Sequence, residues 1–389
     1  MEKRVLLIVG TRPEAIKLIP LYTFLKQASF DAILCATNQH TDLLIQACAI
    51  FDVVPDINLN VMQDDQDLFH ITQTVLVKLK TVYNNLNPDL VIVQGDTTTA
   101  FSAALAAFYC KIPVAHVEAG LRSGDKFAPY PEEINRKFIT QLATYHFAPT
   151  ALNVAQLLHE GVARNAIFCT GNTVVDALML IKQKIERGEL QVNEQLKVLV
   201  QKSKLAGKKL MLLTAHRRES FNGGLLRVFN AIRQFMQQYP DVVAFYPSHP
   251  NPNVVHAIDD SGIKELKNMH MSAPLSYVEF IYLLMSVDWV VTDSGGIQEE
   301  AVSLGKFVLV LRDVTERVEC FWEGLGRLVG TRKDLIMQGL QECYEGVGLE
   351  SSNVFGDGNA VQRITTILKS KLCDVKCVDV NEHYVASMQ

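Results

Sequence analysis

Several signatures that would assign a function class at once are missing from this sequence. It contains no HExxH, no EF-hand loop, no paired CxxC and no H-x-E followed by P-C-x-x-C, so a metal ion is not indicated. It contains neither GxGxxG nor a P-loop, which leaves a bound nicotinamide unsupported. We therefore expect neither a metal nor a cofactor.

The sequence also lacks a basic excess and long hydrophobic runs. Lysine and arginine number 37 against 42 aspartate and glutamate, for a formal net charge of -5. A charge of this sign gives no broad basic field of the kind that holds nucleic acid or an anionic membrane. No apolar run approaches the roughly 20 residues of a membrane span, and the first residues show no signal-peptide pattern. We expect a cytoplasmic protein with no nucleic-acid or membrane partner, in which local cations meet any phosphate ligand.

Cysteines are present but their spacing does not pair them. All eight lie in scattered apolar or terminal contexts, which favours buried reduced thiols over disulfides. Cys35 and Cys110 have no evident activating neighbour, although the sequence leaves a reactive role open for both.

Length and hydrophobic periodicity predict two α/β domains. A chain of 389 residues, 48% of them hydrophobic, exceeds what one core usually supports. Short β-branched runs alternate with stretches of helical period, which is typical of a parallel sheet covered on both faces. The expected strands are 4–9, 31–37, 90–94, 114–118, 146–148, 167–170, 209–213, 242–246, 289–292 and 307–311. The expected helices are 15–26, 43–51, 68–85, 98–109, 174–187, 225–238 and 277–285.

The alternation of predicted strands and helices is interrupted once along the chain and then resumes. The segment 188–208 is polar and poor in strand signal, and it marks a domain boundary. We expect one Rossmann-like domain at 1–172 and a second at 173–358, then a helix at 359–372 and a tail at 373–389.

The first strand is followed by a candidate anion site. Ligands of doubly wound sheets bind beyond the carboxyl ends of the strands, and here a glycine turn leads into a helix start with Arg12 and Lys17. An ordinary turn with Pro13 near the first helical position explains the same residues equally well.

Three carboxylates follow at later strand or helix ends. Asp96 closes a strong strand, Glu118 ends an otherwise apolar one, and Glu132 lies at a helix start. Singly, helix capping explains Asp96 and the helix dipole explains Glu132. Three acids facing one crevice would repel one another and separate their pKa values, which divides acid from base roles.

The second half offers a glycine-rich turn between a strand and a helix. The backbone amides of Ser294, Gly295 and Gly296 could cradle a diphosphate, and Glu299 or Glu300 could accept from ribose hydroxyls. A buried tight turn is the alternative interpretation.

Cations accompany this turn. His216 follows a strand together with two arginines, and Arg312 and Arg317 end another strand. A solvated charge run explains the arginines beside His216 as well.

Taken together, the motifs of both halves resemble those of one family. They are GTRPEAIK (10–17), GDTTT (95–99), HVEAGLRSGD (116–125), PEEINR (131–136), GNTVVDAL (171–178), HRRES (216–220), HPNPNV (249–254) and TDSGGIQEEA (292–301). In this order, over about residues 4 to 368, they resemble the non-hydrolysing UDP-N-acetylglucosamine 2-epimerases of bacteria. The resemblance implies two Rossmann-like domains facing each other across a cleft, as in GT-B glycosyltransferases, and a homodimer whose last helix crosses back to the first domain.

The reaction implied by the resemblance is interconversion of UDP-GlcNAc and UDP-ManNAc. The C2 proton is not next to a carbonyl, so its direct abstraction would be very slow. The implied route eliminates UDP to give 2-acetamidoglucal and adds it back after C2 is reprotonated on the other face.

The resemblance also carries over residue by residue. It places Asp96, Glu118 and Glu132 on the catalytic carboxylates, and Arg12, Lys17 and His216 near the diphosphate and leaving group. The remaining matches are to the UDP site: Ser294, Gly295, Gly296, Glu300 on the ribose, Phe280 near uracil, and Arg317 nearby.

Three departures from the family pattern fall on its activating UDP-GlcNAc site. Thr41 and Asp42 stand where many members have an arginine and a further polar residue, and Asp65 stands near the position of a second arginine. We expect this allosteric site to be weak or altered.

Other activities stay open at this stage. They are C2 epimerisation of another UDP-2-acetamido sugar, hydrolysing epimerisation with release of UDP, and GT-B glycosyl transfer.

Overall fold

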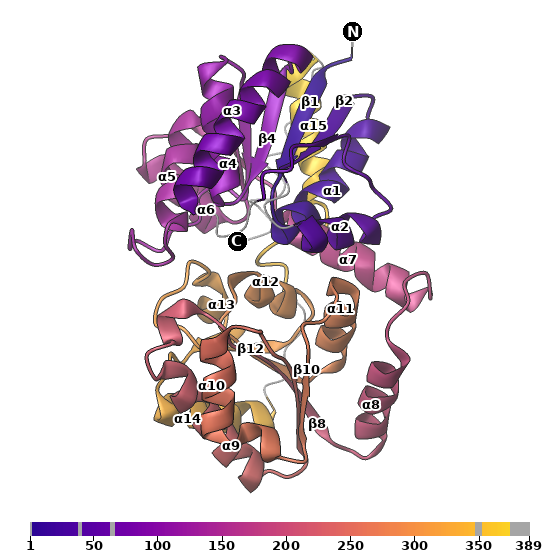
Figure 1. Ribbon diagram of the computed structural model, residues 1–389, viewed down its shortest axis with the longest axis vertical. Helices are drawn as coiled ribbons and strands as arrows, with labels where there is room; N and C mark the ends of the chain where they lie inside the picture. The colour runs from indigo at the N-terminus through magenta and orange to yellow at the C-terminus, as the bar shows by residue number, and fades with distance from the viewer. Residues whose placement is uncertain (1, 38–40, 63–66, 347–351, 374–389) are drawn as a thin grey trace. The chain divides into compact units, whose positions relative to one another are not determined.

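The computed structural model describes residues 2–37, 41–62, 67–346 and 352–373, and their contacts divide the chain into two compact units. Unit 1 comprises the described residues of 1–179 and 355–389, and unit 2 those of 180–354 (Figure 1). Each unit has a parallel sheet whose strands alternate with helices along the chain, which confirms the predicted α/β fold with two Rossmann-like domains.

Unit 1 is built on a seven-stranded parallel sheet with the order β3-β2-β1-β4-β5-β6-β7. The strands are β1 (Arg4–Val9), β2 (Asp31–Ala36), β3 (Ile57–Asn58), β4 (Leu90–Gln94), β5 (Val114–Val117), β6 (Tyr145–Ala148) and β7 (Ile167–Cys169). The helices are α1 (Arg12–Gln27), α2 (Thr41–Ile50), α3 (Leu68–Leu86), α4 (Thr98–Tyr109), α5 (Glu132–Leu142), α6 (Ala151–His159) and α15 (Ala360–Leu372), with a 3-10 turn η1 (Arg164–Ala166). The strand order reverses between β1 and β4, so the loops after these two strands flank the position where such sheets bind ligands.

The two central strands of unit 1 are completely buried by helices. Leu6 and Val91 pack in one core cluster with Leu79 of α3 and Ala103 of α4. Alanines recur along α4, which lets it lie close to the sheet and to α3. Each fully buried leucine or valine contributes about 1.5 to 3 kcal/mol, so this cluster holds the two loops at the reversal in fixed positions.

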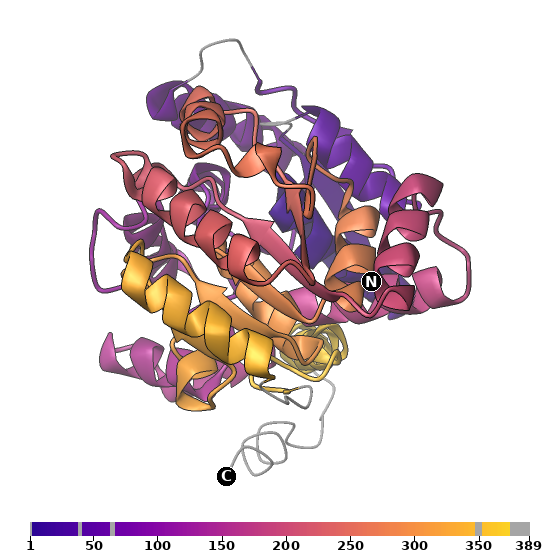
Figure 2. The ribbon, with the colours of Figure 1, turned by 90° about the horizontal axis from the view of Figure 1, so that it is seen from below.

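Unit 2 repeats the arrangement with six parallel strands in the order β10-β9-β8-β11-β12-β13. The strands are β8 (Lys209–Thr214), β9 (Val242–Pro247), β10 (Met269–Ser272), β11 (Trp289–Thr292), β12 (Phe307–Val310) and β13 (Gly326–Leu328). The helices are α8 (Glu194–Leu205), α9 (Gly224–Gln238), α10 (Pro252–Ser261), α11 (Tyr277–Ser286), α12 (Gly295–Ser303), α13 (Glu319–Trp322) and α14 (Lys333–Glu345), with 3-10 turns η2 (Arg218–Ser220) and η3 (Ile263–Glu265). Helices α9 and α14 pack side by side (Figure 2). Here the order reverses between β8 and β11.

Two chain segments pass between the units. Helix α7 (Thr173–Glu186) contains the first division, between Met179 and Leu180, and the second falls before Phe355. In unit 1 the Asp176 carboxylate accepts from the amides of Ala360 (3.2 Å) and Val361 (2.9 Å) and so anchors the start of α15. The returning chain is thereby fastened to the start of α7.

Three strands (β3, β10 and β13) and five helices (α6, α8, α10, α13 and α14) were not predicted from the sequence. β3, β10 and β13 are edge strands of two to four residues, too short to show a hydrophobic period. Helix α8 lies within the polar, strand-poor segment 188–208, which the sequence analysis marked only as a domain boundary, because the helix buries only a short face around Val200. Among the described residues, no helix is long and apolar enough to cross a membrane.

Two histidines are buried side by side in unit 1. His116 of β5 is in register with His146 of β6, and its Nε2 donates to the carbonyl of Gly95 (2.7 Å). Burial lowers the pKa of His116 to about 3 and that of His146 to about 4. Both rings are therefore neutral in the folded protein at neutral pH, whereas the unfolded chain protonates them below about pH 6.5.

This difference predicts a loss of stability in mild acid. The folded pKa lies below the unfolded one, so the stabilisation is complete above about pH 6.5 and falls as the pH drops toward the folded values. Between about pH 7.5 and pH 5, wild type should lose about 2 kcal/mol more unfolding free energy than His116→Gln. Urea titrations followed by circular dichroism measure this, with His256→Gln, an exposed histidine of α10, as the control that keeps the wild-type slope. Equal slopes for wild type and His116→Gln would contradict the prediction.

Candidate active site

The loop after β1 approaches its neighbours too closely for any side chain at Gly10. A Cβ there would lie 2.6 Å from Oγ1 of Thr99 and 2.8 Å from Oγ1 of Thr37. The chain then enters α1 at Arg12, with Pro13 in the first turn, where its missing N–H costs nothing. Arg12 is half-buried, and its side chain forms no hydrogen bond or ion pair with any residue that the structure describes.

A buried carboxylate that the sequence analysis missed braces this loop. Glu14 accepts from the amides of Gly10 (2.9 Å) and Thr11 (2.7 Å) and from the hydroxyls of Thr11 (2.8 Å) and Thr97 (2.6 Å). Burial raises its pKa, and the four hydrogen bonds oppose that shift. Because Thr97 belongs to the turn after β4, Glu14 ties together the two loops at the strand reversal. The Thr11-x-x-Glu14 spacing of a capping box was the sequence signal for it.

Glu118 and Lys17 lie in contact at the end of β5. Lys17 Nζ is 2.5 Å from Oε2 of Glu118, and both side chains are almost fully buried. The side-chain amide of Gln94 donates to the same oxygen, and that of Asn172 lies 3.4 Å from Oε1. Glu118 also has a φ of +66°, a left-handed conformation that costs a non-glycine residue about 1 to 2 kcal/mol. A strained, buried, ion-paired acid does little for folding, which favours a functional role.

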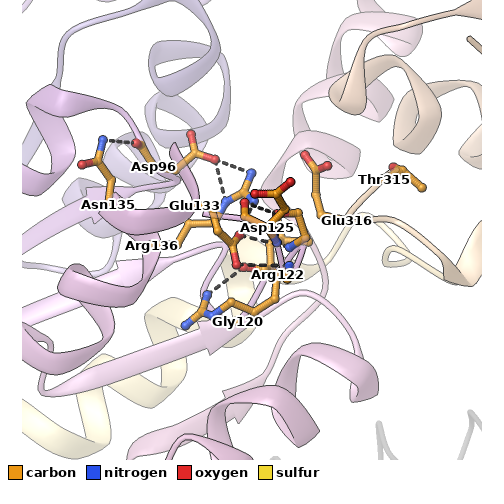
Figure 3. A network of polar contacts seen from close by, with 12 residues as sticks. Asp96, Gly120, Arg122, Asp125, Glu133, Asn135, Arg136, Thr315 and Glu316 are labelled. Carbon is orange, nitrogen blue, oxygen red and sulfur yellow. Dashed lines mark hydrogen bonds and ion pairs between the residues drawn. The ribbon is translucent and has the colours of Figure 1, made fainter. Parts of the chain in front are cut away.

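Asp96 is held by an arginine that is itself fixed (Figure 3). Arg136 approaches Oδ2 of Asp96 with Nε (2.8 Å) and Nη2 (2.6 Å), and its Nη1 lies 3.2 Å from Glu133. Glu133 is completely buried and also accepts from the amides of Ser123 (3.0 Å) and Gly124 (3.3 Å). The Asp96 side chain remains 25% exposed, so one face of the carboxylate is open to a ligand.

Glu132 and Glu133 are adjacent at the start of α5 but differ in environment. Glu132 is partly exposed, whereas Glu133 has no exposed surface and belongs to the Arg136 cluster. The sequence singled out Glu132 and missed the structural partner beside it.

In unit 2, the loops after β8 and β11 are also joined by a carboxylate. Oδ2 of Asp293 accepts from the amides of His216 (2.5 Å) and Arg217 (2.7 Å). The ring of His216 stacks on that of His249, with centroids 5.2 Å apart and planes 9° apart. The structure therefore brings the predicted His216 next to the glycine-rich turn.

That turn opens helix α12 as predicted. Ser294 is the N-cap residue without a side-chain cap bond, and α12 begins at Gly295. A Cβ on Gly295 would lie 2.5 Å from Nη1 of Arg317, whereas Gly296 has open space around it. The free amides of the first turn thus point to a place where an anion can approach.

Arg317 lies in a buried ion-pair cluster behind the turn. Its Nε is 2.5 Å from Glu299 and its Nη1 is 2.5 Å from Glu316, which also pairs with Arg312 at 3.1 Å. Glu299 is thereby engaged with Arg317.

Glu300 lies against helix α11. It accepts a hydrogen bond from the hydroxyl of Tyr277. Phe280, half-buried, is three residues after Tyr277 and lies on the same face of α11. Glu300, matched to the ribose position, is therefore joined to the helix that carries Phe280, matched to the uracil position.

Some expectations fall outside these observations. Asp65 lies outside the described residues, and the side chains of Thr41 and Asp42 are not described, so the expected change at the activating site stays a prediction. No group of three or more histidine, cysteine, aspartate or glutamate residues that could hold a metal is found over the described ranges.

Comparison with known proteins agrees with the sequence resemblance. The family model described as UDP-N-acetylglucosamine 2-epimerase matches residues 23–369. The UDP-N-acetylglucosamine 2-epimerase of Escherichia coli K12 is 42% identical over 379 residues, covering 94% of this chain and 98% of its own. That of Yersinia pestis is 43% identical over 377 residues, with the same coverage. This chain belongs to the UDP-N-acetylglucosamine 2-epimerase family.

Solved structures of the family have the same fold. The UDP-GlcNAc 2-epimerase of Neisseria meningitidis, bound to UDP-GlcNAc, matches with a TM-score of 0.87 at 39% identity, over 94% of this chain and all of that one. A glycosyltransferase of Rickettsia africae matches at 15% identity with a TM-score of 0.60, over 96% of this chain and all of that one, which shows a shared fold alone. The predicted fold of two Rossmann-like domains is thus confirmed, and this family member shares it with a glycosyltransferase.

The adjacent acids of α5 give a prediction that separates structure from function. Glu133→Gln should lower the free energy of unfolding by about 3 kcal/mol, because the buried Arg136 loses a charged partner. Glu132→Gln should change it by less than about 1 kcal/mol. Urea unfolding followed by circular dichroism measures both, since the two tryptophans lie in unit 2 and do not report on α5. Equal losses for the two variants would contradict this division.

Proposed function

We propose that this protein interconverts UDP-GlcNAc and UDP-ManNAc by epimerisation at C2 of the sugar. Family membership supports the reaction class. The observation that carries the proposal further is the pair of carboxylates at the carboxyl edge of the unit 1 sheet. Asp96 and Glu118 are each held by a cation, Arg136 and Lys17.

The reaction proceeds by elimination and re-addition of UDP. A carboxylate takes the C2 proton, the electrons of that bond form the C1–C2 double bond, and the C1–O bond breaks with its electron pair leaving on UDP. The product is 2-acetamidoglucal. Protonation of C2 from the other face, with attack of the UDP oxygen on C1, gives the epimer. These reaction steps involve no net oxidation or reduction and need no cofactor.

The acid and base work falls to the unit 1 carboxylates. Asp96, Glu118 and Glu132 provide the groups that remove and deliver the C2 proton. Their supports differ, since an arginine holds Asp96 whereas a lysine and two amides surround Glu118. Different supports are what two carboxylates need in order to take opposite roles.

Cations and amides stabilise the departing UDP. The diphosphate meets Arg12, Lys17 and His216, the first-turn amides of α12 at Gly295 and Gly296, and the hydroxyl of Ser294, whose own amide donates to Oγ1 of Thr292 (3.0 Å). Glu300 binds the ribose hydroxyls, and Phe280 stacks near uracil. The ion pairs of Arg317 with Glu299 and Glu316 support a role in shaping the turn beside Gly295.

Exchange of hydrogen at C2 tests the proposal directly. UDP-GlcNAc incubated with the protein in D2O should gain deuterium at C2 and form a minor fraction of UDP-ManNAc, both visible by proton NMR. Asp96→Asn, Glu118→Gln and Glu132→Gln should each lower kcat by about 100-fold or more. Substrate recovered without deuterium at C2 would overturn the mechanism.

The same assay separates the alternatives. A hydrolysing epimerase would release free UDP in step with ManNAc. A glycosyltransferase would consume UDP-GlcNAc only when an acceptor is present. An epimerase of another UDP-2-acetamido sugar would exchange C2 of that sugar much faster than C2 of UDP-GlcNAc.

The protein also acts, in this proposal, as a homodimer through unit 1. Large apolar side chains are exposed on the packed helices α3 and α4: Phe69 (84%), Val77 (63%), Phe108 (55%) and Tyr109 (69%). Solvent exposure of so many large side chains on neighbouring helices is typical of an interface.

Light scattering should therefore give twice the 43.4 kDa of one chain. Phe69→Glu should shift the protein toward the monomer, because a charge is placed within the apolar contact. Leu205→Glu, at an 89% exposed position of α8 in unit 2, is the matched control and should keep the dimer. A monomer in the wild type would refute the proposal.

The cysteines support a cytoplasmic location. The described ones are all free, and burial raises the thiol pKa of Cys35 and Cys343 to about 12. Thiols in that state are inert, which argues against the nucleophilic role left open for Cys35.

A further inference from the structure

Asp293 is a buried acid of the motif TDSGGIQEEA to which neither the sequence analysis nor the proposed reaction assigns a role. It follows β11 directly, and its side chain is 2% exposed. Its Oδ2 accepts from two backbone amides of the loop after β8, those of His216 and Arg217. These two hydrogen bonds satisfy Oδ2 of Asp293 and hold the carboxylate in place, which also fixes the position of Oδ1.

The second oxygen faces the ring of His216. Oδ1 of Asp293 is buried and accepts no hydrogen bond from any residue in the described ranges, and Nδ1 of His216 lies 3.5 Å away. A buried acceptor left unsatisfied costs about 1 to 3 kcal/mol. The nearby hydroxyl of Tyr246 is already donated to the carbonyl of Ala215 (3.0 Å). A hydrogen bond of about 3.0 Å requires Nδ1 to approach Oδ1 by about 0.5 Å from the 3.5 Å of this structure.

A second histidine fixes the plane of that ring. His249 stacks on His216, and its Nδ1 accepts from the amide of Asn251 (3.1 Å), which leaves the proton of the neutral ring on Nε2. Burial lowers the pKa of His249, and so does the adjacent His216. His249 is therefore a neutral ring packed against one face of His216. The stacking restricts the His216 ring to movement within the plane of that ring.

We propose that Asp293 is the positioning residue for His216, whose Nδ1–H it binds so that Nε2 is the nitrogen presented to the ligand. The partner of one imidazole nitrogen decides which tautomer is present. With Nδ1 protonated, Nε2 can take up a proton and give it to the departing diphosphate, while Asp293 offsets the charge of the protonated ring. This inference rests on the proposed function only in naming the diphosphate as the ligand.

The tautomer of His216 is measurable without any assay of activity. Protein labelled with 15N-histidine, examined by solid-state NMR at about pH 8, gives separate shifts for protonated and unprotonated ring nitrogens. The His216 signals are assigned by their loss in His216→Gln. We expect Nδ1–H in wild type and Nε2–H in Asp293→Asn, because the asparagine amide donates to Nδ1 while its oxygen keeps the two backbone amides.

The kcat for exchange at C2 should fall when the tautomer of His216 changes. Asp293→Asn should lower kcat for C2 exchange at least tenfold with KM changed less than about threefold, since the substrate contacts stay in place. Asp288→Asn is the matched control: Asp288 precedes the same strand and accepts from the amide of Leu210 in β8 (2.7 Å), but it meets no histidine. It should keep the wild-type tautomer and the wild-type kcat.

The outcomes are distinct. A wild-type His216 protonated at Nε2 overturns the proposal even if Asp293→Asn fails to fold, because that spectrum needs no Asp293 variant. An unchanged tautomer in a folded Asp293→Asn also overturns it. A tautomer that changes as expected in a protein with no C2 exchange supports the positioning role and refutes the epimerase function instead.

Discussion

In each domain, one buried carboxylate holds together the two loops at the reversal of strand order. Glu14 does so in unit 1, through the amides after β1 and the Thr97 hydroxyl after β4. Asp293 does so in unit 2, from the loop after β11 to the amides after β8. Loops at a reversal leave amide groups without sheet or helix partners, and a carboxylate satisfies several of them at once. The side chains proposed for the reaction depend on these braces, since Asp96 and His216 lie on the braced loops and Arg12 follows directly at the start of α1.

Unit 1 buries ion pairs that add little to the free energy of folding. Lys17 with Glu118, and Arg136 with Glu133, lie almost fully out of water, and Arg136 also pairs with the partly exposed Asp96. Desolvation offsets much of the attraction within such pairs, and apolar residues of similar size often stabilise a fold better. The proposed reaction gives a reason for these ion pairs. It needs carboxylates at fixed positions beside C2 of the sugar, and the paired cations hold them there.

The sequence predicted the parts of this picture that depend on short-range pattern. Strands such as β4 and β11 were placed to the residue because they are continuous apolar runs, and the glycine turn before α12 was recognised by its spacing. Edge strands such as β13 were missed, because three residues carry no period. The braces were missed for another reason: Glu14 meets Thr97 and Asp293 meets His216 across more than seventy residues, and a local signal such as the capping-box spacing of Glu14 does not reveal a distant partner.

The structure changes the role that the sequence analysis predicted for Lys17. As a cation of the first loop it was expected at the diphosphate, yet its ammonium group lies against Glu118. An ammonium has three donors, so it can contact a phosphate oxygen and a carboxylate together. In the proposed reaction, charge grows on the leaving diphosphate as the C2 proton moves. A shared lysine would shift its attraction toward the diphosphate at that moment, so that loss of UDP and proton transfer at C2 are linked through one side chain.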